Sequence, residues 1–235
     1  MTSVTKLLGM TATVMALAGA PGGRAALYEF LATGGGHYTA SWSGPAQGIP
    51  DNDLSGVAFA LDFSATGLRI TDISVSISIS GGWNGDLYAY LSHGSDYAIL
   101  LNRVGAVSAG ADGYSTSGLN ILLQPGSTHP GIADIHLTQN PNAPPTGYAA
   151  DGRVDYTDPS RSQTLDVFQD RDPNGSWTLF FADVSPVFGS TLRGWSLDIT
   201  AVPEPVNQAL GCFAGLFLLV TVVRCERVRR LFRRS

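Results

Sequence analysis

The segment Leu68–Ile79, with the sequence LRITDISVSISI, shows the clearest alternation of apolar and polar residues in the chain. From Ile73 onwards isoleucine and valine occupy every second position, and Ser74, Ser76 and Ser78 stand between them. Successive side chains of a β-strand point to opposite faces of the sheet. The segment therefore predicts an antiparallel strand with one buried face and one solvated face.

The same period of two recurs on both sides of this segment, and helix signals are absent from the middle of the chain. Further strands are expected at Val57–Phe63, Leu87–Leu91, Tyr97–Arg103, Trp177–Ala182 and Leu192–Thr200. The dipeptide Asn84-Gly85 lies between two apolar runs, which is a strong signal for a β-hairpin turn. Short strands joined by glycine-rich turns predict an all-β sandwich or barrel-like domain.

The stretch 104–161 interrupts this pattern. Glycine, serine, aspartate, asparagine and proline dominate it, and Pro141, Pro144 and Pro145 mark a loop. Two short strands are expected inside it, at Leu119–Leu123 and Ile132–Leu137. Its apolar content is too low for a separate core, so we interpret it as an elaborated loop region of the same domain.

The C-terminal end combines three unlike segments. Val202-Pro203-Glu204-Pro205 comes first, an apolar run at 206–223 follows, and residues 224–235 contain six arginines. Because an apolar helix enters the bilayer and arginines stay on its cytoplasmic side, this order predicts a single transmembrane helix. The charge-free stretch Leu210–Val223 is shorter than the ~20 residues of a typical span, a gap that arginine snorkelling can close. A buried helix at the end of a globular domain is the alternative, and the arginine cluster argues against it.

The N-terminal end fits a secretory signal peptide over residues 1–25. Lys6 precedes the mainly apolar stretch Leu7–Ala20, and small residues continue to Ala25, after which we expect cleavage. Cleavage after Ala20 would place Pro21 directly behind the cut, which is unfavourable, and an uncleaved anchor is the other alternative. Together the two ends place the middle of the chain outside the cytoplasmic membrane.

The exported middle, residues 26–201, is strongly acidic. It holds six of the chain's 14 basic residues and 17 of its 19 acidic ones, a formal net charge of −11. Such a surface argues against nucleic acid as a partner, because phosphate binding needs clustered lysine and arginine, and it is compatible with metal cations. Both cysteines, Cys212 and Cys225, lie in the anchor, so burial and hydrogen bonding stabilise the domain without a disulfide.

The ordered set of motif, apolar run and basic tail resembles the PEP-CTERM sorting signal of bacterial surface proteins. The resemblance implies processing by a membrane enzyme of the exosortase type, with Glu204 as the recognition point. The residues that match the signal are Val202, Pro203, Glu204, Pro205, Arg224, Arg227, Arg229 and Arg230. The resemblance also implies an inner-membrane intermediate that then reaches the cell surface or the extracellular space, where such proteins accompany polysaccharide and biofilm.

Other stretches resemble the P domain, or homo B domain, of proprotein convertases. The first half of the match is GIPDN at 48–52 and GDLYAYL at 85–91. The second half is DPNGSWTL at 172–179, then Asp183, then GSTLRGWSL at 189–197. The resemblance departs from the family between 104 and 161. It implies an eight- or nine-stranded, jelly-roll-like β-sandwich over residues 26–201.

The matching residues have a mainly structural interpretation. Asn174 and Gly175 are expected to supply the positive backbone dihedrals of a tight turn. Trp177 and Trp195 each lie two residues from a leucine and are expected to fill the core, and an aromatic ligand platform is the alternative. Five other aromatic residues are open to two interpretations, a glycan-binding face or ordinary packing: Trp42, Trp83, Tyr88, Tyr90 and Tyr114.

Aspartates in three loops are the candidate metal ligands. The clusters are Asp151, Asp155 and Asp158 in one loop, Asp170, Asp172 and Asn174 in another, and Asp51 and Asp53 in a third. Calcium takes six to eight oxygen ligands, and some P domains carry calcium, so calcium is the candidate cofactor. No run is a complete calcium loop, and the alternative is that aspartate simply favours turns and solvated surface.

The sequence contains no catalytic motif that we recognise. It lacks the serine, aspartate and histidine settings of a subtilisin-like protease, and its four histidines are dispersed without zinc-site spacing. Walker and dinucleotide-binding motifs are also missing. We therefore expect an exported, non-catalytic protein of the envelope or matrix that binds glycan or protein. The alternatives are a P-domain accessory of a subtilisin-like serine protease (a subtilase) and a calcium-dependent lectin.

Overall fold

The computed structural model describes residues 12–13, 29–42, 44–141, 147–204, 213 and 221. Within these residues the chain is all-β, as the sequence pattern predicts, and its strands form one nine-stranded and one four-stranded sheet, more strands than the eight or nine that the P-domain resemblance implies. The expected signal peptide, transmembrane segment and arginine-rich tail lie almost entirely outside the described residues. In the described part of the chain, no helix has the length and apolar character needed to cross a membrane.

The larger sheet is built around two strands of 14 residues each, β6 (Leu68–Gly81) and β13 (Ser190–Pro203), which pair antiparallel. Along the sheet the order is β1 (Ala12–Thr13), β2 (Glu29–Gly34), β3 (His37–Trp42), β13, β6, β9 (Leu119–Gln124), β11 (Tyr148–Ala149) and β10 (Ala133–Asp134). The short strand β4 (Gln47–Ile49) also pairs with β13.

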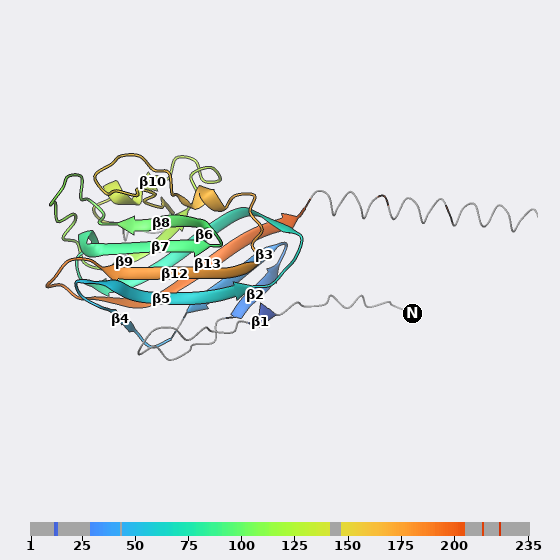
Figure 1. The fold of residues 1–235 in the computed structure, drawn as a ribbon, viewed down its shortest axis with the longest axis horizontal. Helices are drawn as coiled ribbons and strands as arrows, with labels where there is room; N and C mark the ends of the chain where they lie inside the picture. Colours follow the sequence, from blue (N-terminus) through green and yellow to red (C-terminus); the bar gives the residue numbers. More distant parts are fainter. Residues whose placement is uncertain are drawn as a thin grey trace, which may run out of the picture.

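The smaller sheet contains β5 (Asp53–Phe63), β12 (Gly175–Asp183), β7 (Leu87–His93) and β8 (Asp96–Asn102), in that order. Figure 1 shows these four strands lying across the face of the larger sheet, so the two sheets form the layers of a sandwich. Three short 3₁₀ turns complete the described elements: η1 (Asn84–Asp86), η2 (Ile135–Leu137) and η3 (Leu165–Phe168).

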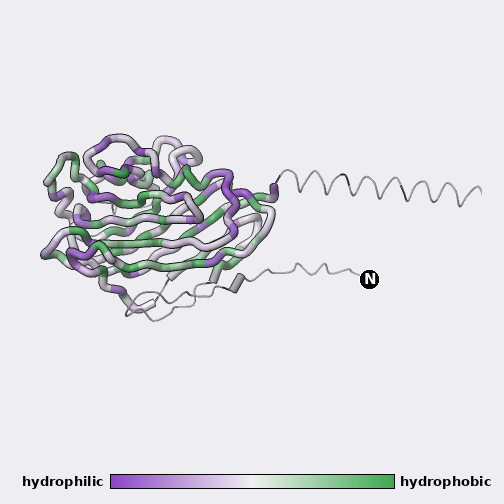
Figure 2. The backbone as a smooth tube through the Cα atoms, viewed as in Figure 1, coloured by the Kyte–Doolittle hydropathy of each residue, from purple (hydrophilic) through white to green (hydrophobic). Residues whose placement is uncertain are grey.

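The core lies between the two sheets and follows the alternation of the sequence. On β6 the side chains of Ile73, Val75 and Ile77 are at most 1% exposed, whereas the serines between them are half-buried on the outer face. Trp177 on β12 and Trp195 on β13 are 0% and 3% exposed. Figure 2 shows hydrophobic stretches along the strands of the body and hydrophilic residues in many of its loops.

The hairpin expected at Asn84-Gly85 is wrong, because β6 and β7 belong to different sheets. The positive backbone φ angles fall earlier, at Gly81 and Gly82, where the chain leaves the larger sheet. The Asn84 side chain donates to Thr116 Oγ1 and to the Gly118 carbonyl, both at 3.1 Å. The dipeptide therefore packs against the 112–118 loop and joins the two layers of the sandwich.

The 104–161 region packs onto the sandwich, and its strand expected at Ile132–Leu137 is reduced to β10. The chain turns into η2 after Asp134, whose carboxylate accepts a hydrogen bond from the His136 backbone at 3.0 Å. The far end of this region lies along β8, where the Gly152 backbone donates to the Ile99 carbonyl at 2.9 Å.

Candidate functional site

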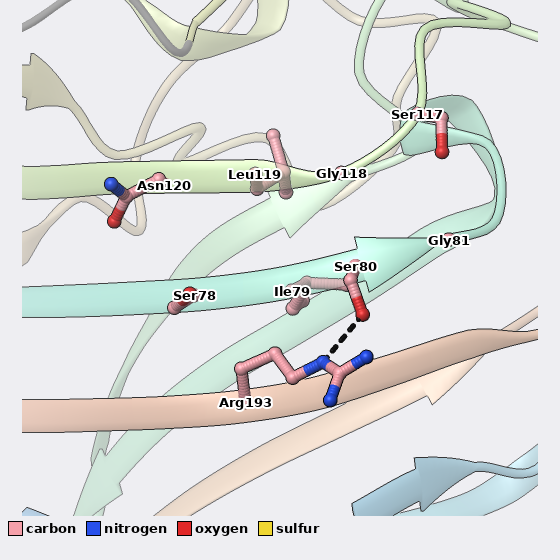
Figure 3. A pocket seen from close by; sticks show the side chains of 9 residues that line it. All are labelled: Ser78, Ile79, Ser80, Gly81, Ser117, Gly118, Leu119, Asn120 and Arg193. Carbon is pink, nitrogen blue, oxygen red and sulfur yellow. Dashed lines mark hydrogen bonds between the residues drawn. The ribbon is translucent and has the colours of Figure 1, made fainter. Parts of the chain in front are cut away.

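The candidate site is a pocket of about 300 Å³ on the outer face of the larger sheet, near the end where β6 leaves it. Its lining comes from three neighbouring strands and one loop: Ser78, Ile79, Ser80 and Gly81 of β6, Ser117 and Gly118, Leu119 and Asn120 of β9, and Arg193 of β13. Figure 3 shows the Arg193 side chain reaching from β13 towards Ser80 on β6. This volume is at the lower limit of the ~300–1,000 Å³ typical of small-molecule sites.

A β-bulge places Arg193 in this pocket. The pairing of β13 with β6 shifts between Leu192, opposite Ile79, and Gly194, opposite Ser78, so that Arg193 is the extra residue. A bulge re-aims side chains because it inserts one residue into the alternation. Here it lets both Leu192 and Trp195 face the core, while Arg193 lies exposed on the outer face.

The guanidinium of Arg193 is oriented by a hydroxyl. Its Nε donates to Ser80 Oγ at 2.7 Å, the dashed line in Figure 3. Four of the six arginines in residues 26–201 pair with carboxylates, namely Arg69, Arg153, Arg161 and Arg171. Within the described residues Arg193 forms no ion pair, and its Nη groups carry no hydrogen bond.

The remaining polar side chains of the pocket suit a ligand with several hydroxyl groups. Ser78 and Asn120 lie directly opposite each other on β6 and β9, and Ser117 stands at the rim in the preceding loop. Serine hydroxyls and asparagine amides both donate and accept hydrogen bonds. No local pattern in the sequence marks Arg193 or Asn120 as a site residue. The outward positions of the serines were visible in the alternation, but their neighbours across the sheet were not.

Four of the six predicted calcium ligands already accept hydrogen bonds from protein groups through their carboxylates. Asp151 is fully buried, and one oxygen of its carboxylate accepts from His136 Nδ1 at 2.7 Å while the other accepts from Arg153 Nη1 at 3.2 Å. Asp155, Asp158 and Asp172 each accept a backbone N–H two residues further on, in exposed turns. Asp170 and Asn174 are exposed, and among the described residues no three His, Cys, Asp or Glu side chains gather closely enough to hold a metal.

The predicted structural motif lies at the start of β12. Gly175 has the expected positive φ, +117°, a conformation that favours glycine, but Asn174 does not have the positive φ that was also expected. The Asn174 backbone instead donates to the Asp172 carboxylate at 3.0 Å. Trp177 donates from Nε1 to the Pro173 carbonyl at 2.9 Å and stacks on the His93 ring, with the two ring centroids 4.1 Å apart. These contacts hold the loop before β12 against the core.

Two carboxylates at one end of the sandwich are buried without an ion pair in the described part of the chain. Asp183 and Asp86 are 0% and 3% exposed, and Asp183 Oδ2 has no hydrogen-bond partner there. The pKa of Asp183 is raised from 3.8 to about 6, mainly by burial, and the charges of Asp86 and Asp51 act in the same direction. Burial likewise raises the pKa of Asp86.

The other aromatic residues lie outside the pocket and pack with one another. Trp42 is 7% exposed and packs on Phe59 in the core. Trp83 stacks on Phe188, with ring centroids 4.5 Å apart. The side chains of the other three residues are half-buried: Tyr88, Tyr90 and Tyr114. None of the nine residues that line the pocket is aromatic.

Part of the predicted sorting motif belongs to the sandwich. β13 continues through Val202 and Pro203, which pair with Arg69 and Leu68 of β6, two residues beyond the domain end expected at Ala201. Glu204 forms an ion pair with Arg69 at 3.0 Å. The other residues of the predicted signal, Pro205 and the four arginines, lie outside the described residues, as does the expected cleavage position Ala25.

A scan against models of protein families finds no match, and a search of curated proteins finds none either. Among solved structures, the chain is similar to the serine protease of Aeromonas sobria. The crystal structure of that protease with its chaperone aligns with a TM-score of 0.39 and 16% identity over 72% of this chain and 26% of that chain. The crystal structure of the protease without the chaperone aligns with a TM-score of 0.37 and 14% identity, over 69% of this chain and 26% of that chain. Similarities this low support no conclusion about this chain.

Proposed function

We propose that this chain is an exported, non-catalytic β-sandwich of the cell envelope or matrix that binds extracellular glycan through the pocket at Arg193. The observation that carries this proposal is the pocket itself, which gathers hydroxyl, amide and guanidinium groups on an exposed sheet face. Sugars present hydroxyl groups in several directions, and such side chains can donate to and accept from them. Rigid strands hold the pocket residues in place, which lowers the entropic cost of binding.

The export part of the proposal rests on the two chain ends. A signal peptide over 1–25 would deliver the domain across the membrane, and a PEP-CTERM signal over 202–235 would hold it for an exosortase-type enzyme. For the domain itself we propose a P-domain-like jelly roll, supported by the turn at Gly175 and by the buried Trp177 and Trp195 in its closing motif.

Blocking the pocket is expected to weaken glycan binding strongly. Replacing Ser78 by tryptophan would fill the space between β6 and Asn120, and we expect binding to immobilised polysaccharides to fall by about tenfold or more. Ser74→Trp is the matched control, since Ser74 faces the same side of β6 outside the pocket. The measurement is retention of the purified full-length chain on a panel of neutral and acidic polysaccharides. Equal retention of both variants would place binding elsewhere.

Removing the sorting motif is expected to stop processing. The double substitution Glu204→Ala and Pro205→Ala should strand the full-length chain in the inner membrane, because the exosortase-type enzyme would lose its recognition point. Cell fractionation followed by mass spectrometry of the mature termini tests both ends together. Unchanged release of a shortened chain would contradict the sorting proposal, and recovery of a subtilase with the wild type would favour an accessory role.

A further inference from the structure

We infer that the pocket selects polysaccharides that carry carboxylate groups, such as uronic-acid polymers, and that Arg193 is the residue that binds the carboxylate. This inference rests on the proposed function and narrows its ligand class. Arginine presents a planar set of donors that matches a carboxylate, and such charge-assisted hydrogen bonds are about twice as strong as neutral ones.

Charge balance in the domain makes Arg193 unusual. Residues 26–201 carry 17 acidic side chains against six basic ones, so carboxylate partners are plentiful. Four of the arginines take such partners, and Arg103 donates to the carbonyls of Gly85 and Ala111. In the described residues Arg193 has one hydrogen bond, to the Ser80 hydroxyl. None of the nine residues that line the pocket is acidic. An arginine that forms no ion pair within the described residues, in a pocket whose lining holds no acidic side chain, fits an external carboxylate.

The hydrogen bond to Ser80 prepares the guanidinium for this ligand. It uses Nε and leaves both Nη groups for an incoming carboxylate. Because Ser80 accepts this bond, its own O–H can still donate to a ligand oxygen. Holding the arginine in one orientation before binding reduces the side-chain entropy that binding costs.

The other pocket residues favour a sugar acid over an acidic peptide. Ser78, Ser117 and Asn120 line the same pocket as Arg193 with short polar side chains that suit the hydroxyls of a sugar ring. Aromatic side chains, on which a neutral sugar would stack, are missing from the lining. Recognition therefore depends on hydrogen bonds and on one charge, and a ligand without a carboxylate would lose the strongest of these contacts.

The net charge of −11 opposes a polyanion at long range. Salt weakens this repulsion, since charges separated by more than about 8 Å are largely screened at physiological ionic strength. The direct contact of Arg193 with a carboxylate is much shorter than that distance. The domain charge therefore reduces the rate of encounter more than it weakens the contact in the pocket.

The test compares four polymers on the full-length chain purified in detergent: polygalacturonate, dextran, dextran sulfate and polyglutamate. We expect polygalacturonate to bind best, and Arg193→Gln to weaken that binding by about tenfold to a hundredfold, the loss typical of a hydrogen bond to a charged group. Arg193→Lys keeps the positive charge but lacks the planar guanidinium, so its affinity for polygalacturonate should lie between those of the wild type and Arg193→Gln. Arg171→Gln, in an arginine already paired with Asp96, should bind like the wild type.

Each other outcome overturns the inference in a recognisable way. If dextran binds as well as polygalacturonate, and Ser78→Trp abolishes its binding, the proposed function stands but the requirement for a carboxylate is wrong. Tighter binding of dextran sulfate or polyglutamate would reassign the ligand to a sulfate ester or an acidic peptide. Unchanged polygalacturonate binding by Arg193→Gln would remove the role of Arg193, and no binding to any polysaccharide would overturn both proposals. Because Arg193 is exposed, its variants should melt at the wild-type temperature. Ser80→Ala is a second variant, and we expect it to weaken polygalacturonate binding several-fold.

Discussion

Replacing Asp151 by alanine is expected to lower the free energy of unfolding by about 3 to 5 kcal/mol, the typical cost of removing one partner from a buried ion pair. For a chain of this size the melting temperature should fall by about 6 to 20 °C. The residue is fully buried, so solvent cannot replace the contacts that the substitution removes.

The reason is the number of groups that depend on this carboxylate. It accepts from the buried ring of His136, from the Arg153 guanidinium and from the Asn102 backbone at 2.7, 3.2 and 3.2 Å. His136 and Arg153 are 1% and 5% exposed. Against the effect of burial, the carboxylates of Asp134 and Asp151 raise the pKa of Arg153. Without Asp151 these donors would stay buried, and the 104–161 region would lose one of its hydrogen bonds with β8.

Asp155→Ala is the matched control. Asp155 belongs to the same predicted calcium cluster, but it is exposed and accepts only from Thr157 within its own turn. Its loss should change stability by no more than about 1 kcal/mol. Melting is followed by circular dichroism with and without a calcium chelator. If both variants melt alike, or if chelator lowers the wild type as much as Asp151→Ala does, the ion-pair explanation is wrong and a calcium site in this loop gains support.

Replacing Asp183 by asparagine is expected to stabilise the protein at high pH. Asparagine has nearly the same shape and carries no charge, so it removes the cost of burying an ionised carboxylate beside Asp86 and Asp51. The gain should be about 1 to 2 kcal/mol at pH 8, allowing for solvent screening. Asparagine can still accept from the Ser185 backbone, as Asp183 does at 3.5 Å.

The pH dependence has a definite sign. The pKa of Asp183 in the folded chain is about 6, above the ordinary value of 3.8, so the folded state holds the proton more tightly than the unfolded state. The stability that this proton contributes is fully present below pH 3.8 and is lost as the pH rises through about 6. The wild type should therefore lose stability relative to Asp183→Asn between about pH 4 and 7, and the two should converge in acid.

Melting temperatures of both proteins from pH 4 to 8 provide the measurement. Asp53→Asn serves as the control, because a backbone hydrogen bond from Ser55 lowers the pKa of Asp53, the opposite direction. That variant should show no gain at high pH. A constant difference between wild type and Asp183→Asn across the whole range would mean that the charge of Asp183 plays no part.

The strands themselves could be predicted because their signal is local. The alternation of isoleucine and serine in β6 indicates which side chains are buried, whichever strands pair with it, because a strand has a period of two residues. The Asn84-Gly85 turn shows the limit of such local signals. The dipeptide by itself is compatible with a hairpin. In the fold, Asn84 instead bonds to the distant Thr116 and Gly118, and the chain passes from one sheet to the other at this point.

The candidate site and the buried ion pairs depend on partners that local patterns do not reveal. Ser78, Asn120 and Arg193 line one pocket only because β9 and β13 pair on either side of β6, and Arg193 is the extra residue of the bulge in β13. Asp151 could be interpreted as a turn residue or a metal ligand until the fold placed it beside His136 and Arg153. The sequence thus specified strands, faces, charge and the motifs at both ends, because these follow from neighbouring residues. Register and long-range pairing specified which polar groups meet, because that depends on the arrangement of the whole sheet.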